Sequence, residues 1–175
     1  MTTNKKQLIL GAGKYPKPRI YFPGREEYED AVKLDINPDN NPDVLWDLNN
    51  RPLPFEDNEF DEIHAYDVLE HVGKQGDFIS FFEEFAEYYR IIKDQGDFLI
   101  TSPLWDGRWA WGDPGHTRII SKELFSYLDK DKYEGSGDTA MSDYRKWLKC
   151  DFKFITDLTK RDDSYTGAYV LRAYK

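Results

Sequence analysis

Short apolar segments, each closed by a glycine, a proline or an aspartate, follow one another along the first 103 residues of the chain. Segments of this length bounded by turn formers are typical of strands. Turns and one helical segment separate them, so the pattern predicts an open, mainly parallel α/β sheet. The predicted strands are Gln7 to Leu10, Ala31 to Ile36, Val44 to Leu48, Phe60 to Ala65 and Asp97 to Ser102.

Three segments have the pattern of a helix. From about Asp77 to Lys93, aromatic side chains recur at helical spacing, Asp77 can cap the amino terminus and Gln95-Gly96 ends the pattern. We expect a second helix over Ser121 to Leu128, with its first residue as the cap, and a third, short one over residues 140 to 149.

Prolines constrain the first connection between strands. Pro16, Pro18 and Pro23, together with Gly24, exclude a helix before Arg25. We therefore expect an abbreviated first crossover helix. The same prolines count against a nicotinamide-dependent oxidoreductase, because the pyrophosphate of that cofactor normally rests on a helix N-terminus at this place.

The last part of the chain changes character. Phe152 to Leu158 and Ala168 to Tyr174 are extended runs, and the polar segment Lys160 to Ser164 between them suits a hairpin. The sheet is therefore expected to finish with an antiparallel pair. No repeat or long linker divides the chain, so residues 1 to 175 are predicted to form a single domain.

Composition narrows the classes of protein. Cys150 is the only cysteine, which excludes an internal disulfide, and one cysteine with three histidines does not make a closed zinc site, so no metal is expected. The net charge of −9 argues against nucleic-acid binding, which needs a basic face. No apolar run approaches the ~20 residues that span a bilayer, and the first residues are polar. We expect a cytoplasmic protein without a membrane partner.

Groups suited to ligand binding stand at three predicted strand ends. The Gly11-Ala12-Gly13 turn offers a backbone against which a ligand can lie. Asp35 follows Gly13 by 22 residues, where a carboxylate can accept hydrogen bonds from both hydroxyls of a ribose. The alternative for Asp35 is a cap of the Asn37-Pro38 turn. Asp47 repeats the arrangement one strand later and can accept a hydrogen bond from an exocyclic amine. The pattern predicts a nucleoside pocket.

The chain resembles class I S-adenosylmethionine-dependent methyltransferases in the order and spacing of LILGAG, KLDINP, VLWDLN, LPFEDNEFDEIHAYDVLEHV and DFLITSP. The resemblance covers roughly residues 7 to 130 and is closest to a small bacterial and phage subgroup with a shortened first helix. It implies a Rossmann-like, mainly parallel seven-stranded sheet with a C-terminal antiparallel hairpin. It also implies S-adenosylmethionine as the cofactor.

The resemblance assigns cofactor contacts residue by residue. Two positions depart from the family's pattern: Ile9 stands where many members have an acidic residue, and Tyr15 where a third glycine is usual. The implied contacts are the methionine-binding loop Gly11, Ala12 and Gly13, the ribose carboxylate Asp35 with its neighbour Ile36, the adenine contacts Asp47 and Leu48, and Tyr66, Asp67 and His71 after the fourth strand.

The connection after the fifth strand carries the candidates for acceptor chemistry. Methyl transfer needs donor and acceptor held in line, and a hydroxyl or amine acceptor benefits from a base within hydrogen-bond reach. His116 is the catalytic candidate and Asp113 could orient it; the alternative for His116 is a cap of the helix that follows. Trp105, Trp109 and Trp111 could wall a substrate pocket, or pack a lid or a subunit contact.

These patterns predict an enzyme that transfers a methyl group from S-adenosylmethionine to a small-molecule or sugar-like acceptor. The alternative is a catalytically silent module that binds S-adenosylmethionine, a nucleoside or a partner. Ile9 and Tyr15 are the features that support this alternative.

Overall fold

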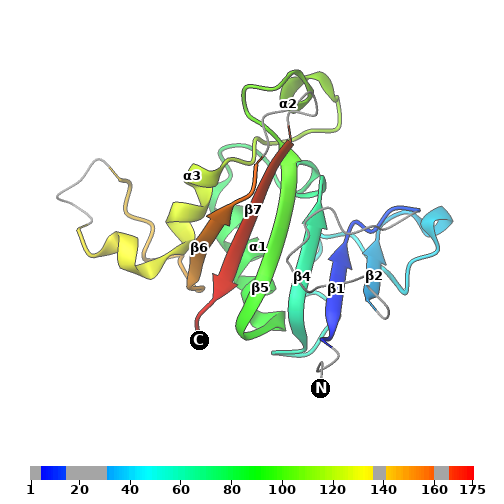
Figure 1. Ribbon diagram of the computed structural model, residues 1–175, viewed down its shortest axis with the longest axis horizontal. Helices are drawn as coiled ribbons and strands as arrows, with labels where there is room; N and C mark the ends of the chain where they lie inside the picture. Colours follow the sequence, from blue (N-terminus) through cyan, green and yellow to red (C-terminus); the bar gives the residue numbers. More distant parts are fainter. Residues whose placement is uncertain (1–4, 15–30, 136–140, 160–165) are drawn as a thin grey trace.

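The structure is a computed structural model that describes residues 5–14, 31–135, 141–159 and 166–175. Seven strands form one sheet in the order β3-β2-β1-β4-β5-β7-β6 (Figure 1). Strands β1 to β5 pair in parallel, whereas β7 pairs antiparallel with both β5 and β6. The strands are β1 Gln7–Leu10, β2 Val32–Asp35, β3 Val44–Leu45, β4 Phe60–Tyr66, β5 Ile92–Pro103, β6 Phe152–Asp157 and β7 Thr166–Ala173.

This sheet confirms the predicted α/β fold with its antiparallel ending. The expected abbreviation of the first crossover falls on residues 15–30, outside the described residues. The described helices are α1 Phe78–Ile91, α2 Arg108–Gly112 and α3 Lys122–Phe125. Within the described ranges, no helix has both the length and the apolar character needed to cross a membrane.

The helix α1 covers one face of the sheet (Figure 1). Its buried Phe85 and Tyr88 meet Phe98 of β5, with ring centroids 6.2 and 5.2 Å apart. Asp77 caps the helix as predicted, because its side chain accepts a hydrogen bond of 3.1 Å from Ser80 N. Burial of this aromatic face holds α1 against one face of the sheet. The helix therefore does not cover the carboxyl ends of the strands.

The end of α1 was predicted wrongly. The helix stops at Ile91 and β5 begins at once at Ile92, before Gln95-Gly96. Pairing of Ile92 with Phe60 draws this residue into the sheet. Gly96 serves close packing inside the strand, since a Cβ there would lie 2.6 Å from Ile92 Cγ1.

Two further helix predictions need correction. The α-helix after Ser121 covers only Lys122–Phe125 and continues as a 3-10 turn, and the Ser121 side chain makes no capping hydrogen bond. Among residues 141–149 the structure has a single turn and no helix. The rings of Tyr144 and Trp147 pack on Phe78 at 5.1 and 5.0 Å, so tertiary contacts hold this segment in place.

Candidate functional site

The glycine turn after β1 packs against the segment that follows β4. Gly11 and Gly13 have φ angles of +56° and +64°, in the left-handed region that favours glycine. A Cβ at Gly11 would lie 2.9 Å from Val68 Cβ and closer still to Val68 Cγ2. The buried Ala12 donates its N–H to Leu34 O at 3.1 Å, which ties the turn to β2. The turn therefore has a fixed shape at the carboxyl edge of the sheet.

Asp35 ends β2 and connects to this turn. Its Oδ2 accepts a hydrogen bond of 2.7 Å from Gly13 N, and its Oδ1 accepts one of 2.8 Å from Asn37 N. The second bond is the predicted cap of the Asn37-Pro38 turn. A carboxylate has about four acceptor positions, so two remain for a ligand. Asp35, which is buried, serves the turn, and its contact with ribose hydroxyls stays a prediction.

The residues assigned to adenine follow β3, and Ile36, the neighbour of the ribose carboxylate, follows β2. Asp47 and Leu48 lie beyond the end of β3, which is shorter than predicted. Asp47 Oδ1 accepts from Asn49 N and Nδ2 at 2.8 and 3.0 Å. Leu48 is buried, whereas Ile36 is 65% exposed and presents an apolar side chain next to Asp35. The contact of these residues with adenine stays a prediction.

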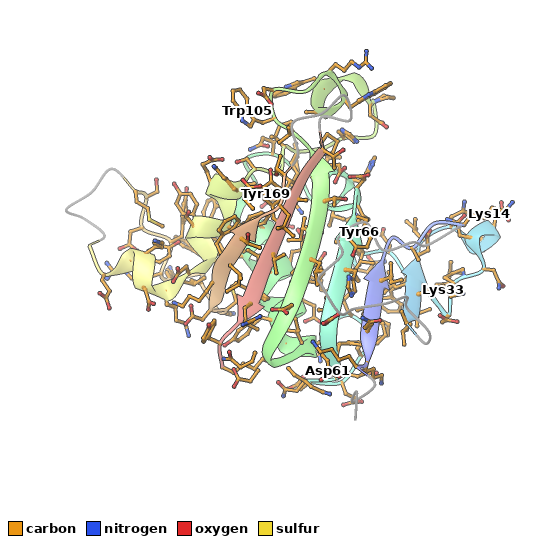
Figure 2. All side chains as sticks on the ribbon, in the orientation of Figure 1. Lys14, Lys33, Asp61, Tyr66, Trp105 and Tyr169 are labelled. Carbon is orange, nitrogen blue, oxygen red and sulfur yellow. The ribbon has the colours of Figure 1, made fainter. Side chains whose placement is uncertain are left out.

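Tyr66, labelled in Figure 2, is the last residue of β4, and Asp67 follows it directly. Tyr66 is buried, and its hydroxyl lies 2.8 Å from His64 Nδ1. Asp67 has a φ of +55°, donates its N–H to Thr101 O at 2.9 Å and accepts from Thr101 Oγ1 at 3.0 Å. Two hydrogen bonds with Thr101 of the neighbouring strand β5 thus hold the Asp67 carboxylate and a backbone conformation that a non-glycine residue rarely adopts.

A cavity of about 260 Å³ lies beyond the ends of β4 and β5. Its walls come from the 3-10 turn after β4, from α2 and the loop behind it, and from the start of β7. Three of its lining side chains are carboxylates and two are imidazoles. The lining residues are Asp67, Glu70, His71, Pro103, Trp109, Asp113, His116 and Thr166.

The two histidines of this cavity meet edge to face, with ring centroids 4.6 Å apart. Nδ1 of His71 lies 3.0 Å from Gly115 O, and Nδ1 of His116 lies 3.4 Å from Ala110 O. Asp113 Oδ2 is 3.9 Å from His116 Nε2, beyond hydrogen-bond distance, while Asp113 Oδ1 accepts from Gly115 N at 2.7 Å. Asp113 therefore shapes the loop that carries His116.

The alternative role of His116 as a helix cap is wrong, because Ser121 occupies the position before α3. His71, assigned to the cofactor by resemblance, lies beside His116 in this cavity. Sequence reasoning missed Glu70, whose side chain is buried and lines the same cavity. The sequence shows that Glu70 and His71 are neighbours. It does not show that Glu70 lies close to His116, which is 46 residues further along the chain, because that proximity depends on the fold.

The tryptophans of this connection are exposed rather than packed. Trp105, Trp109 and Trp111 are 56%, 53% and 75% exposed. Figure 2 places Trp105 in the segment beyond the end of β5, with Tyr66 near the same edge and Asp61 at the opposite end of the sheet. Trp109 lines the cavity of the two histidines. Trp109 therefore suits a cavity wall, whereas packing of a lid or of a subunit contact stays a prediction.

Comparison with known proteins gives similarity in structure only. No family model and no curated protein sequence matches the chain. A SAM-dependent methyltransferase from Archaeoglobus fulgidus aligns with a TM-score of 0.57 and 16% identity, over 96% of this chain and 86% of that one. One from Aquifex aeolicus aligns with a TM-score of 0.55 and 14% identity, over 97% and 82%.

A third similar structure contains a cofactor product. The methyltransferase CalH, solved with SAH, aligns with a TM-score of 0.54 and 16% identity, over 97% of this chain and 51% of that one. Such low identities carry an argument about the fold and not about the reaction. The chain has the Rossmann-like fold of S-adenosylmethionine-dependent methyltransferases.

Proposed function

We propose that this protein transfers a methyl group from S-adenosylmethionine to a small-molecule or sugar-like acceptor. The observation that carries the proposal is the bond from Gly13 N to Asp35 at the carboxyl ends of β1 and β2, on the side of the sheet where the histidine-lined cavity lies beyond β4 and β5. In this proposal residues 1–175 form one domain of the small bacterial and phage subgroup.

The residues at the edge of β1 and β2 suit the cofactor. Gly11 and Gly13 leave backbone without side-chain bulk, and among the described residues no atom outside the chain neighbours lies within 4 Å of the position a Cβ would take on Gly13. Asp35 supplies a carboxylate for the ribose hydroxyls, and Asp47 supplies an acceptor for an exocyclic amine. When bound, S-adenosylmethionine would supply a methyl group on a sulfonium; the lone pair of the acceptor would attack the methyl carbon in line, and the sulfur would leave as a thioether.

The cavity beyond β4 and β5 suits the acceptor. Its volume of about 260 Å³ approaches the roughly 300–1,000 Å³ of small-ligand pockets. His116 lines it, so this imidazole can take the proton that a hydroxyl or amine acceptor loses. Trp109 forms an apolar wall. The net charge of −9 favours a small acceptor over a nucleic acid.

One observation favours a module that binds S-adenosylmethionine without catalysis. Ile9 is buried in β1, at a position where many similar enzymes have an acidic residue, and it has no side-chain acceptor for the cofactor's ammonium group. Tyr15, the other departure, lies outside the described residues. This second function predicts cofactor binding without turnover.

Two measurements test the proposal in sequence. Calorimetric titration with S-adenosylmethionine and S-adenosylhomocysteine should show one site, weakened by Asp35→Ala and unaffected by Asp39→Ala, which removes an exposed carboxylate nearby. The parent protein should then transfer a labelled methyl group to a panel of small hydroxylated and amine acceptors faster than the His116→Ala variant does. Absence of binding would reject both functions, and binding without transfer to any acceptor would favour the silent module.

A further inference from the structure

Three potential metal ligands gather in the acceptor cavity. Glu70, His71 and His116 each offer one ligand atom, and these atoms all lie within 4.8 Å of one another. Ligand atoms about a shared ion at 2.0–2.2 Å stand roughly 3–4 Å apart, so small side-chain shifts would complete the geometry. The Glu70 side chain is 2% exposed, whereas His71 is open to the cavity and to solvent.

The histidine tautomers suit metal binding. A backbone carbonyl only accepts hydrogen bonds, so the contacts of His71 Nδ1 with Gly115 O and of His116 Nδ1 with Ala110 O place the proton on Nδ1. Each Nε2 then carries the lone pair. Metal-ligating histidines characteristically donate their other ring N–H to a carbonyl or carboxylate, which fixes the tautomer and the ring orientation.

Backbone hydrogen bonds hold the two ligand-bearing segments together. The carbonyl oxygen of Glu70 accepts from Thr117 N at 2.8 Å, from Thr117 Oγ1 at 3.1 Å and from Arg118 N at 3.3 Å. Arg118 Nε also donates to Leu69 O at 2.9 Å. His116 directly precedes Thr117, so these bonds fix it beside the Glu70-His71 pair before any ligand arrives.

The charge of the cavity favours a cation. Asp67, Glu70 and Asp113 line it, and its described walls contain no lysine or arginine. Divalent ions compete well for such a site, because opposite charges attract strongly where protein excludes water. The expectation of no metal rested on the lack of ligands for a closed zinc site, and an open site with three protein ligands departs from that expectation.

We propose that Glu70, His71 and His116 bind one divalent transition-metal ion in this cavity. Two imidazoles with one carboxylate suit Zn²⁺, Mn²⁺, Fe²⁺ or Co²⁺ rather than Mg²⁺ or Ca²⁺, which prefer oxygen ligands. Three protein ligands leave positions open for water or for an oxygen of the acceptor. The metal site itself does not depend on the proposed function. Binding of the methyl acceptor to the ion does rest on the proposed function, and in that case the acceptor presents a hydroxyl or carboxylate oxygen to the ion.

This assignment changes the expected role of His116. As a ligand, His116 holds the ion instead of taking the acceptor's proton itself. The ion lowers the pKa of a hydroxyl bound to it, so the O–H proton passes to solvent and the oxygen keeps the electron pair. That pair forms the new bond to the methyl carbon, and the breaking C–S bond leaves its electrons on sulfur as a thioether.

The test uses the full chain, purified without a polyhistidine tag and stripped of metal by a chelator. Titration with Co²⁺ should give a visible absorption band that saturates at one ion per chain. Zn²⁺ should abolish the band, whereas Mg²⁺ should leave it. His71→Ala and Glu70→Gln should each weaken Co²⁺ binding by at least ~10²-fold, because loss of even an outer-shell partner can cost that much.

Controls separate this site from the cofactor site and from misfolding. Glu83→Gln, an exposed change on α1, and Asp35→Ala should bind Co²⁺ like the parent. Circular dichroism melts identify variants that fail to fold, and His71→Gln is a second, more conservative removal of an exposed ligand. No band, or a band unchanged in His71→Ala and His71→Gln, would overturn the metal site. The titration contains no S-adenosylmethionine, so its outcome is independent of the proposed function.

Discussion

The backbone N–H of Gly13 donates a hydrogen bond of 2.7 Å to Asp35 Oδ2, across 22 residues of sequence. This bond couples the shape of the glycine turn to the carboxylate at the end of β2. The second carboxylate oxygen is held by Asn37 N at 2.8 Å. A ligand that engages Asp35 therefore meets a group already oriented by two backbone donors.

Replacing Asp35 by alanine should weaken cofactor binding by roughly 10- to 100-fold, or about 1.5–3 kcal/mol, because a charge-assisted pair of hydrogen bonds is lost. Calorimetric titration measures this change. The same substitution frees Gly13 N and Asn37 N, so loosening of the turn must be separated from loss of the ribose contact. Adenosine and its 2′,3′-dideoxy analogue make that separation: the parent should prefer adenosine, and Asp35→Ala should not. If both proteins prefer adenosine over the dideoxy analogue to the same extent, the ribose does not contact Asp35.

Asp47→Asn should cost less than Asp35→Ala, under about 1.5 kcal/mol of cofactor affinity, since the amide keeps an acceptor oxygen. Asp47 Oδ1 already accepts two bonds from Asn49, so the variant also tests whether that turn survives. Titration of both variants under one condition gives the comparison. A larger loss for Asp47→Asn would reverse the assignment of ribose and adenine ends.

Gly11→Ala should destabilise the protein more than Gly13→Ala. Both positions have positive φ, which costs a residue with a Cβ about 1–2 kcal/mol. Only at Gly11 does the new Cβ also meet Val68, and such overpacking adds typically about 1–3 kcal/mol. Urea unfolding measures both. Val68→Ala in the Gly11→Ala background should recover part of the loss, and strictly additive effects would contradict the predicted contact.

Much of the sheet follows from local sequence. Gln7–Leu10, the β6–β7 pair and the Asp77 cap were predicted from apolar runs and turn formers, because each depends on neighbours in sequence. The end of α1 was not, since Ile92 belongs to β5 through its pairing with Phe60. Pairing between strands thus determines where this helix ends, although the Gln95-Gly96 pair is a typical helix-end signal in the sequence.

The candidate site divides in the same way. Gly11, Gly13 and Asp35 stand at strand ends, and parallel strands bring their carboxyl ends to one edge, so this half of the site could be predicted. The meeting of Glu70 with His116 could not. It depends on hydrogen bonds from Thr117 and Arg118 to the Glu70 carbonyl oxygen. No pattern of residue spacing in the sequence predicts these bonds.

Cys150 should resist alkylation in the folded protein. Burial raises the pKa of its thiol to about 12, and the neighbouring Asp151 acts in the same direction. The thiolate is the reactive form, so at about pH 8 iodoacetamide should modify the unfolded chain and leave the folded one unmodified. Mass spectrometry with and without denaturant reads the difference.

The same shift makes a prediction about alkaline stability. The unfolded thiol ionises near its ordinary value of 9.0, while the folded thiol stays neutral up to about 12. This contribution to stability is therefore complete below pH 9 and is lost as the pH rises towards 12. Cys150→Ala should show a shallower fall in the free energy of unfolding over that range. Equal slopes would contradict the raised pKa.

The segment from Leu104 to Arg118 should respond when cofactor and acceptor bind together. It contains α2 and three tryptophans more than half exposed, and Trp109 lines the acceptor cavity. Covering these indoles should shift their fluorescence to shorter wavelength and slow amide exchange between Trp105 and His116. Trp109→Phe identifies how much of the change comes from the cavity wall.

His116→Ala should lower turnover by roughly 10²-fold or more while cofactor affinity stays nearly unchanged, whether the imidazole takes the proton or holds an ion. A chelator distinguishes these roles: loss of parent activity on metal removal, with recovery on adding Zn²⁺ or Mn²⁺, identifies a ligand, whereas activity that persists identifies a base. Asp39→Ala, distant from this cavity in the chain, is the matched control. A His116→Ala variant as active as the parent, with amide exchange unaltered by ligands, would remove this connection from the reaction.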